Sequence, residues 1–209
     1  FYLMMIGILG VMNFANAQAQ NPECMTNLSI YAEHAKVKNY DAAYTPWKMV
    51  YDNCPSINKA NFTLGEKILA DKIDKSSGAE KDGNIKDLLA LYDNSLKVFP
   101  DQFTKAEVAI DKALLLYDNK MASDAELYKM LDDAFQADRA NFKNPKALYL
   151  YFSSLVDLYN EGSKDLQAVF DTYDDVTEKI EEENDKLTDI ISQLLPKEEA
   201  GTLTSKEKR

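Results

Sequence analysis

Three prolines recur at a fixed interval and restrict what this chain can fold into. Pro55, Pro100 and Pro145 are 45 residues apart, and each follows closely on a stretch whose apolar residues recur at helical spacing. Proline cannot continue a preceding helix, because it lacks the backbone N–H and clashes with the preceding turn. The interval therefore predicts a repeated unit. Repeats of roughly 20 to 50 residues built from helix pairs are typical of an α-solenoid.

Apolar residues follow a helical period nearly everywhere from Cys24 onward. In 88–99 and 147–159 they recur at i, i+3, i+4 and i+7, and no alternating pattern indicates a strand. With 7 Gly and 6 Pro among 209 residues, the chain has too few turn residues for a many-stranded sandwich or barrel. The predicted fold class is all-α, an α-solenoid of four stacked antiparallel hairpins. Its helices are expected at residues 23–37, 40–53, 59–75, 80–98, 103–118, 123–138, 145–160 and 163–195.

The second helix of the first hairpin carries a distinctive set of small and aromatic residues. The set is Tyr40, Ala43, Trp47, Val50 and Pro55. Its spacing is that of the tetratricopeptide repeat, except that Val50 is larger than the usual alanine. The small Ala43 is expected to let the two helices of the hairpin approach closely. Trp47 is expected to fill the space between neighbouring units.

The second unit repeats this pattern with an insertion. Gly65 supplies a small residue, and the later positions are met again between Leu88 and Pro100. Eleven extra residues, which include 76–78, separate the two parts and are expected to lengthen the hairpin. Because repeats of the HEAT type span about 40 to 47 residues, tetratricopeptide and HEAT-like curvature both remain open.

A family resemblance follows from these residues. The run CMTNLSIYAEHAKVKNYDAAYTPWKMVYDNCP, followed by GEKIL and DLLALYDNSLKVFP, resembles exported tetratricopeptide-like proteins of the Bacteroidetes group. The resemblance covers residues 24–100. It implies an envelope protein of stacked helical hairpins and brings no catalytic residues with it.

The first 19 residues have the pattern of a signal peptide. An apolar run of 14 residues, shorter than the roughly 20 that span a membrane, precedes the small residues of 15–19. An initiator Met and a basic start are missing, so we expect that a few codons precede Phe1. The alternative is a buried N-terminal helix. Export to the periplasm or cell envelope is expected, with no transmembrane segment after signal removal.

The chain has two cysteines, Cys24 and Cys54. In an oxidising compartment, two cysteines without a third are expected to form an intramolecular disulfide. The alternative is a pair of buried thiols.

The remainder divides into helical repeats over 20–162 and a C-terminal segment over 163–209. In the latter, Val176, Ile180, Leu187, Ile191 and Leu194 recur at threes, fours and sevens, with Asn184 on the same seam. This long helix is expected either to pack on the solenoid or to pair with another chain. Thr204 and Glu207 have the spacing of a capping box that starts a helix, so we expect further repeats beyond Arg209.

The residue types of known catalytic and metal sites are scarce. One His and two Cys cannot supply common metal sites or nucleophile triads, and no phosphate-binding, calcium or G-x-S-x-G motif occurs. The net charge of −11 opposes binding to nucleic acid. We therefore expect no enzyme activity, no cofactor and no nucleic-acid partner.

The expected function is that of a non-enzymatic scaffold or adaptor that binds protein or peptide partners in the cell envelope. A carbohydrate-binding accessory protein on the same frame is the alternative, suggested by Tyr149 and Tyr151. Self-association through the long helix is a further expectation. The inner surface of the first two units defines the candidate partner groove, made of Leu28, Ala32, Lys36, Phe62 and Glu66.

Overall fold

The computed structural model describes residues 21–208 and is built from α-helices, with no strand in that range. The signal-peptide prediction lies outside these residues. The helices begin and end within four residues of the predicted positions. They are α1 (Pro22–Lys36), α2 (Tyr40–Asn53), α3 (Ala60–Lys75), α4 (Gly78–Val98), α5 (Lys105–Asp118), α6 (Asp124–Ala137), α7 (Pro145–Asn160) and α8 (Leu166–Glu199). Two short 3₁₀ turns, η1 (Pro55–Ile57) and η2 (Arg139–Asn141), precede α3 and α7.

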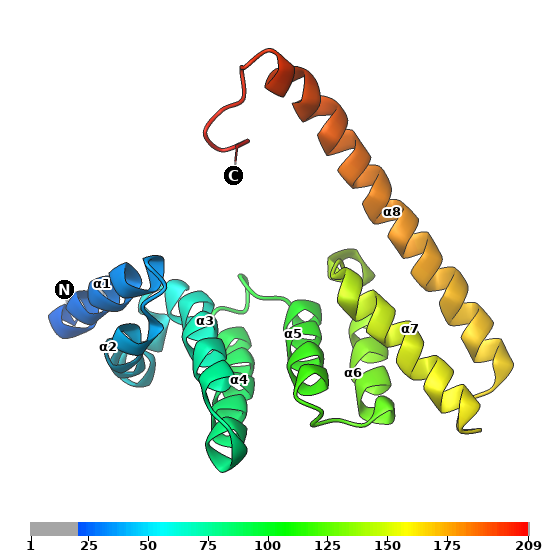
Figure 1. The fold of residues 1–209 in the computed structure, drawn as a ribbon, viewed down its shortest axis with the longest axis horizontal. Helices are drawn as coiled ribbons and strands as arrows, with labels where there is room; N and C mark the ends of the chain where they lie inside the picture. Colours follow the sequence, from blue (N-terminus) through cyan, green and yellow to red (C-terminus); the bar gives the residue numbers. More distant parts are fainter. Residues whose placement is uncertain (1–20, 209) are drawn as a thin grey trace, which may run out of the picture.

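The helices pack as four consecutive hairpins that stack side by side. Within each hairpin the two helices contact each other, and the second helix of each of the first three hairpins contacts the first helix of the next. The α1–α3 and α5–α7 contacts follow from the same stacking. This arrangement, seen in Figure 1, confirms the predicted α-solenoid of hairpins.

Trp47 and Gly65 form the joint between the first two hairpins. The indole is buried, and its Nε1–H donates a hydrogen bond of 2.8 Å to the Asn61 carbonyl in α3. The ring lies so close to Gly65 that a β-carbon there would be 2.5 Å from Trp47 Nε1. Ala43 is also buried in this core. The role predicted for Trp47 is therefore confirmed, and Ala43 is buried within the first hairpin, where its predicted role requires it to be.

Apolar side chains gather into two cores that meet at α5. The first core joins α1 to α4 and includes Val108 of α5. The second joins α5, α6 and α7 and includes Val176 of α8. Because Ala106, Ile110 and Ala113 of α5 belong to the second core, this one helix contributes a face to each.

Three of the four hairpins turn in the same way. After α1, α5 and α7, the residue that follows the C-cap has positive φ, at Lys38, Lys120 and Gly162. Each turn has the paired 6→1 and 5→2 backbone hydrogen bonds of a Schellman motif. The second hairpin differs, because only Ser76 and Ser77 separate α3 from the 21-residue α4. Its extra residues therefore lengthen the helices rather than the loop.

A disulfide joins Cys24 in the first turn of α1 to Cys54 at the end of α2, with a Cα–Cα distance of 6.4 Å. It closes a segment of 30 residues around the first hairpin. The expected pairing is thus present in the structure.

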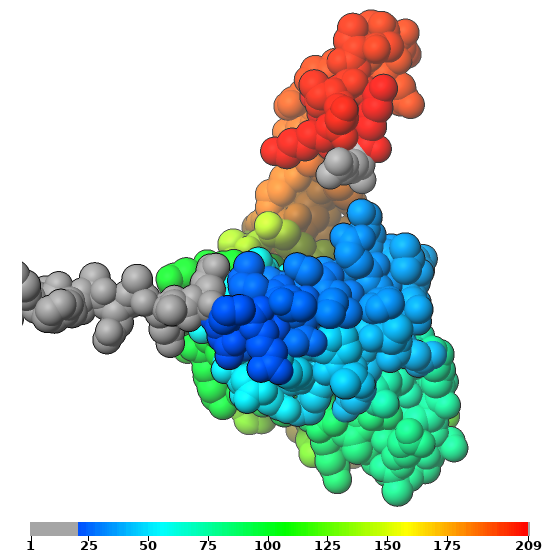
Figure 2. Space-filling model, turned by 90° about the vertical axis from the view of Figure 1, so that its left-hand side faces the viewer, coloured from blue at the N-terminus to red at the C-terminus, as the bar shows by residue number. Residues whose placement is uncertain are grey.

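Helix α8 packs on the solenoid over only part of its length. Thr172, Val176 and Lys179 are buried, and the Lys179 ammonium binds Glu183 at 2.6 Å. Arg139 of η2 holds the same part of α8 through ion pairs with Glu178 and Glu182. The C-terminal half then extends away from the hairpins, as Figures 1 and 2 show.

The prediction that α8 ends before Pro196 is wrong. The helix continues through Pro196 to Glu199 and ends in a Schellman turn with Gly201 at positive φ. Proline keeps a helical φ and removes one hydrogen bond, which costs little near an exposed end where water reaches the free carbonyl. The Thr204–Glu207 capping-box hydrogen bonds do form, but they close a turn rather than start a helix.

Candidate partner-binding site

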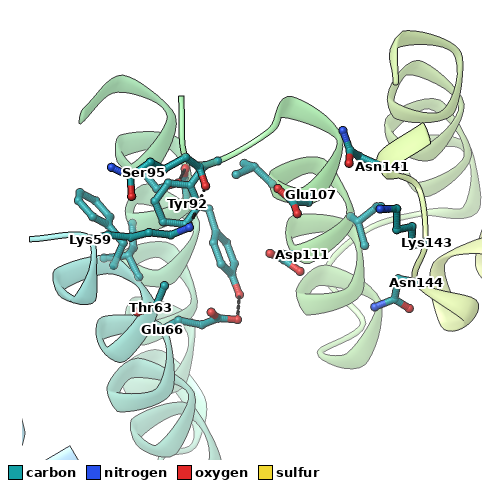
Figure 3. Close-up of a pocket in the computed structure, with 16 residues that line it drawn as sticks. Lys59, Thr63, Glu66, Tyr92, Ser95, Glu107, Asp111, Asn141, Lys143 and Asn144 are labelled. Carbon is teal, nitrogen blue, oxygen red and sulfur yellow. Dashed lines mark hydrogen bonds between the residues drawn. The ribbon is translucent and has the colours of Figure 1, made fainter. Parts of the chain in front are cut away.

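A cavity of about 370 Å³ lies where the second hairpin meets the third. Helices α3, α4 and α5 form its walls, and Asn141 of η2 with Lys143 and Asn144 before α7 also line it, as Figure 3 shows. The side chains that line it include aromatic, carboxylate and amide groups. They are Lys59, Phe62, Thr63, Glu66, Leu91, Tyr92, Ser95, Gln102, Phe103, Glu107, Val108, Ile110, Asp111, Asn141, Lys143 and Asn144.

Aromatic rings form the apolar wall of the cavity. Phe62 of α3 and Phe103, in the turn before α5, meet edge to face with ring centroids 6.0 Å apart. Lys59 lies over the Phe103 ring at 4.6 Å and donates a hydrogen bond of 2.9 Å to the Gln102 carbonyl. The Lys59 ammonium is therefore already engaged at the rim, where it covers one face of the Phe103 ring.

Three carboxylates provide the polar side. Glu66 accepts a hydrogen bond of 3.0 Å from the Tyr92 hydroxyl, and Asp111 faces it from α5, as Figure 3 shows. Burial raises the pKa of Asp111 to about 6, with further contributions from the negative charges of Glu66 and Glu107. Burial and the same Glu66 charge also raise the pKa of Tyr92. The lining thus has three carboxylates against the two ammonium groups of Lys59 and Lys143, which leaves an excess of one negative charge when all five groups are ionised.

Asp111→Asn is expected to stabilise the protein at neutral pH. Because the pKa of Asp111 in the folded chain lies above its unfolded value, its contribution to stability is complete below pH 4 and is lost as the pH rises through about 6. We expect a gain of about 1–2 kcal/mol in the free energy of unfolding at pH 7, after allowance for solvent screening of a partly exposed group. Urea titrations at pH 4 and pH 7 measure it.

The matched control is Asp101→Asn, which changes an exposed carboxylate outside the cavity. This variant should follow the pH dependence of the wild type. An Asp111→Asn variant that does the same would show that the Asp111 carboxyl is not destabilised by its surroundings.

The cavity includes two of the five predicted groove residues, Phe62 and Glu66. The other three, on α1, lie outside it. Leu28 and Ala32 pack against the first core, and Lys36 is exposed beside Glu33 at 4.0 Å. Asp111 and Phe103 could not be predicted from the spacing within a single repeat unit, because only the stacking of α5 on the second hairpin brings them to the cavity.

The two tyrosines that suggested carbohydrate binding do not share a surface. Tyr149 is 68% exposed, whereas Tyr151 is buried and its hydroxyl donates a hydrogen bond of 2.7 Å to Asp132. Residues two positions apart on a helix point in different directions, and here Tyr151 points into the second core.

Within residues 21–208, no helix has both the length and the apolar character needed to cross a membrane. In the same part of the chain, no three His, Cys, Asp or Glu side chains are grouped as metal ligands would be.

Comparisons with known proteins identify a structural likeness only. No family model matches the chain, and no curated protein matches it. The fold is similar to the crystal structure of a thermophilic TPR protein from Thermus thermophilus, with 13% sequence identity and a TM-score of 0.46. The alignment covers 85% of this chain and 84% of that one. The packing of its own helices defines the class of this protein, an α-solenoid of stacked hairpins.

Proposed function

We propose that the chain is a non-enzymatic helical-repeat scaffold that binds a protein partner through the cavity between α3, α4 and α5. The observation that carries this proposal is the cavity itself, which has an aromatic wall and three carboxylates at a junction of two repeats. Stacked hairpins offer extended surfaces between neighbouring units, and peptide segments bind to such surfaces.

The chemistry of the cavity favours a segment that presents a lysine or arginine next to an apolar residue. A cationic group would meet Glu66 and Asp111, and hydrogen bonds between a cationic donor and a carboxylate are among the strong ones. The volume of about 370 Å³ suits one or two side chains rather than a folded domain.

Export to the periplasm or cell envelope is part of the proposal. The Cys24–Cys54 disulfide supports it, because disulfides persist in oxidising compartments and are rare in reducing ones. The signal-peptide pattern of residues 1–19 is a second, sequence-based argument.

Site-specific photo-cross-linking in intact cells tests the proposal. A photoreactive residue replaces Thr63 inside the cavity or, as the control, the exposed Ala90 on α4 outside it. We expect one protein to be cross-linked from position 63 and not from position 90. Glu66→Gln, which keeps the shape and removes the charge, should lower the yield of that adduct about tenfold, since hydrogen bonds to charged groups contribute roughly 1.5–3 kcal/mol.

Tyr92→Phe serves as a second control, because it removes the hydroxyl that binds Glu66 and leaves the carboxylate charge in place. Cross-linking from position 63 should survive in this variant. The same set of adducts from both positions, or an adduct from position 63 that ignores Glu66→Gln, would contradict the proposal.

A further inference from the structure

Helix α8 carries an apolar stripe along its whole length that stays largely exposed. We call it the open stripe, and its positions follow alternating steps of four and three residues. They are Leu166, Phe170, Tyr173, Thr177, Ile180, Asn184, Leu187, Ile191 and Leu194. Six of the seven apolar members are exposed by between 43%, the value for Ile180, and 60%, the value for Ile191.

The open stripe is not the face of α8 that packs on the rest of the solenoid. Thr172, Val176 and Lys179 are the buried residues of α8, and each lies one position before a member of the stripe. A shift of one residue turns a helix by about 100°, so the two faces are distinct. Tyr173 touches Phe152 of α7 at 5.9 Å between ring centroids and is still 53% exposed.

The position of the stripe in the solenoid explains its character. The second helix of each earlier hairpin has two apolar faces, one toward its own first helix and one toward the next hairpin, as the α2–α3, α4–α5 and α6–α7 contacts show. The corresponding second face of α8 is the open stripe, and within residues 21–208 no helix covers it. Nine heptad positions over about 42 Å are the pattern of a helix that pairs with another helix.

The stripe reads the same in both directions about Ile180. Its two polar members, Thr177 and Asn184, lie three residues before and four residues after Ile180, and all the outer members are apolar. If two copies of α8 lie antiparallel with Ile180 at the two-fold axis, Thr177 lies within one residue, about 1.5 Å along the axis, of Asn184 of the other copy. Every apolar position then faces an apolar one, for example Tyr173 against Leu187.

We propose that two copies of this chain pair through their open stripes, with the two α8 helices antiparallel and the two-fold axis at Ile180. Covering the half-exposed apolar side chains on both copies would remove on the order of 1,000 Å² from water, near the lower bound for a specific interface. The C-terminal half of each α8, which extends away from its own hairpins, then lies on the N-terminal half of the other α8. The two solenoids are therefore at opposite ends of the helix pair. This pairing is independent of the cavity and of the function proposed for it.

The negative charge of the chain gives self-pairing a salt dependence opposite to that of pairing with a basic helix. Each chain has a net charge of −11, and the two-fold axis brings Glu181 close to Glu181 of the other copy. Self-pairing should therefore strengthen as salt rises, because screening weakens the repulsion between like charges. A basic amphipathic helix from a different protein would show the opposite dependence.

Sedimentation equilibrium of the full chain tests the pairing itself. We expect a monomer–dimer equilibrium that shifts toward dimer between 50 mM and 500 mM NaCl.

Leu187→Glu should weaken the dimer at least 100-fold, whereas Ser192→Glu, an exposed position outside the stripe, should change it less than threefold. Glu181→Gln should strengthen the dimer several-fold, and Asp185→Asn should leave it unchanged. Circular dichroism confirms that each variant retains its helices.

Cysteine cross-linking with a short bismaleimide tests the orientation. The Cys24–Cys54 disulfide leaves no free thiol, so introduced cysteines report alone. Ile180→Cys should cross-link to itself. Tyr173→Cys and Leu187→Cys should cross-link to each other when mixed and not to themselves, because antiparallel pairing separates the two copies of residue 187 by about 21 Å. A monomer at every salt concentration, self-cross-linking of Leu187→Cys, or association that weakens with salt would each overturn the proposal.

Discussion

Replacing Gly65 with alanine will lower the free energy of unfolding of the full chain by about 2–3 kcal/mol, even though alanine favours a helix over glycine. The added β-carbon would lie 2.5 Å from Nε1 and 2.7 Å from Cε2 of Trp47, closer than such atoms can approach. The indole is 1% exposed and bound to the Asn61 carbonyl, so it cannot move without breaking that hydrogen bond and opening the joint between the first two hairpins. Urea unfolding monitored by the fluorescence of Trp47, the one tryptophan of the chain, measures the loss.

Gly83→Ala is the matched control for this variant. Gly83 lies within α4, and a β-carbon there would meet nothing within 4 Å. Alanine should therefore raise the stability by about 0.5–1 kcal/mol, the usual difference between the two residues in a helix. Equal gains at both positions would mean that Trp47 does not occupy the joint as described.

Removing the Cys24–Cys54 disulfide is expected to have the second large effect. The bond closes a segment of 30 residues, for which the chain-entropy account gives about 3–4 kcal/mol. A variant with Cys24→Ser and Cys54→Ser should lose about this amount in urea unfolding. Thermal unfolding with and without dithiothreitol provides the internal control.

The reductant should destabilise the wild type and leave the double-serine variant unchanged. Equal sensitivity of the two proteins would point to an effect of the reductant elsewhere in the chain. Equal stability of oxidised wild type and double-serine variant would show that the first hairpin is held by its core alone.

The sequence was sufficient to predict the helices and their stacking, because both depend on local periodicity and on short-range signals such as Pro55 and the small Ala43. The end of α8 was not predictable from Pro196 alone. Proline weakens a helix by one hydrogen bond, while a glycine in the left-handed region redirects the chain, and here Gly201 decides where the helix stops.

The candidate site was only half predictable. Phe62 and Glu66 follow from the spacing within α3, but Phe103 and Asp111 reach the same cavity through the way α5 stacks on the second hairpin. That stacking depends on the contact of α4 with α5 and on the contact of Phe103 with Phe62. Neither leaves a pattern within a single repeat unit, so no spacing rule could have placed Asp111 opposite Glu66.

The division of the interior into two cores with α5 between them determines how cooperative this protein is. Stacked repeats have coupling only between neighbours, so the number of unfolding steps depends on the weakest junction. Val108 places one face of α5 in the first core, while Ala106 and Ile110 place another in the second. Unfolding of either core exposes one apolar face of α5, while the opposite face of α5 still belongs to the other core. The stabilities of the two cores are therefore coupled. A segment bound in the cavity beside α5 would strengthen the same junction and make the whole chain unfold more nearly as one unit.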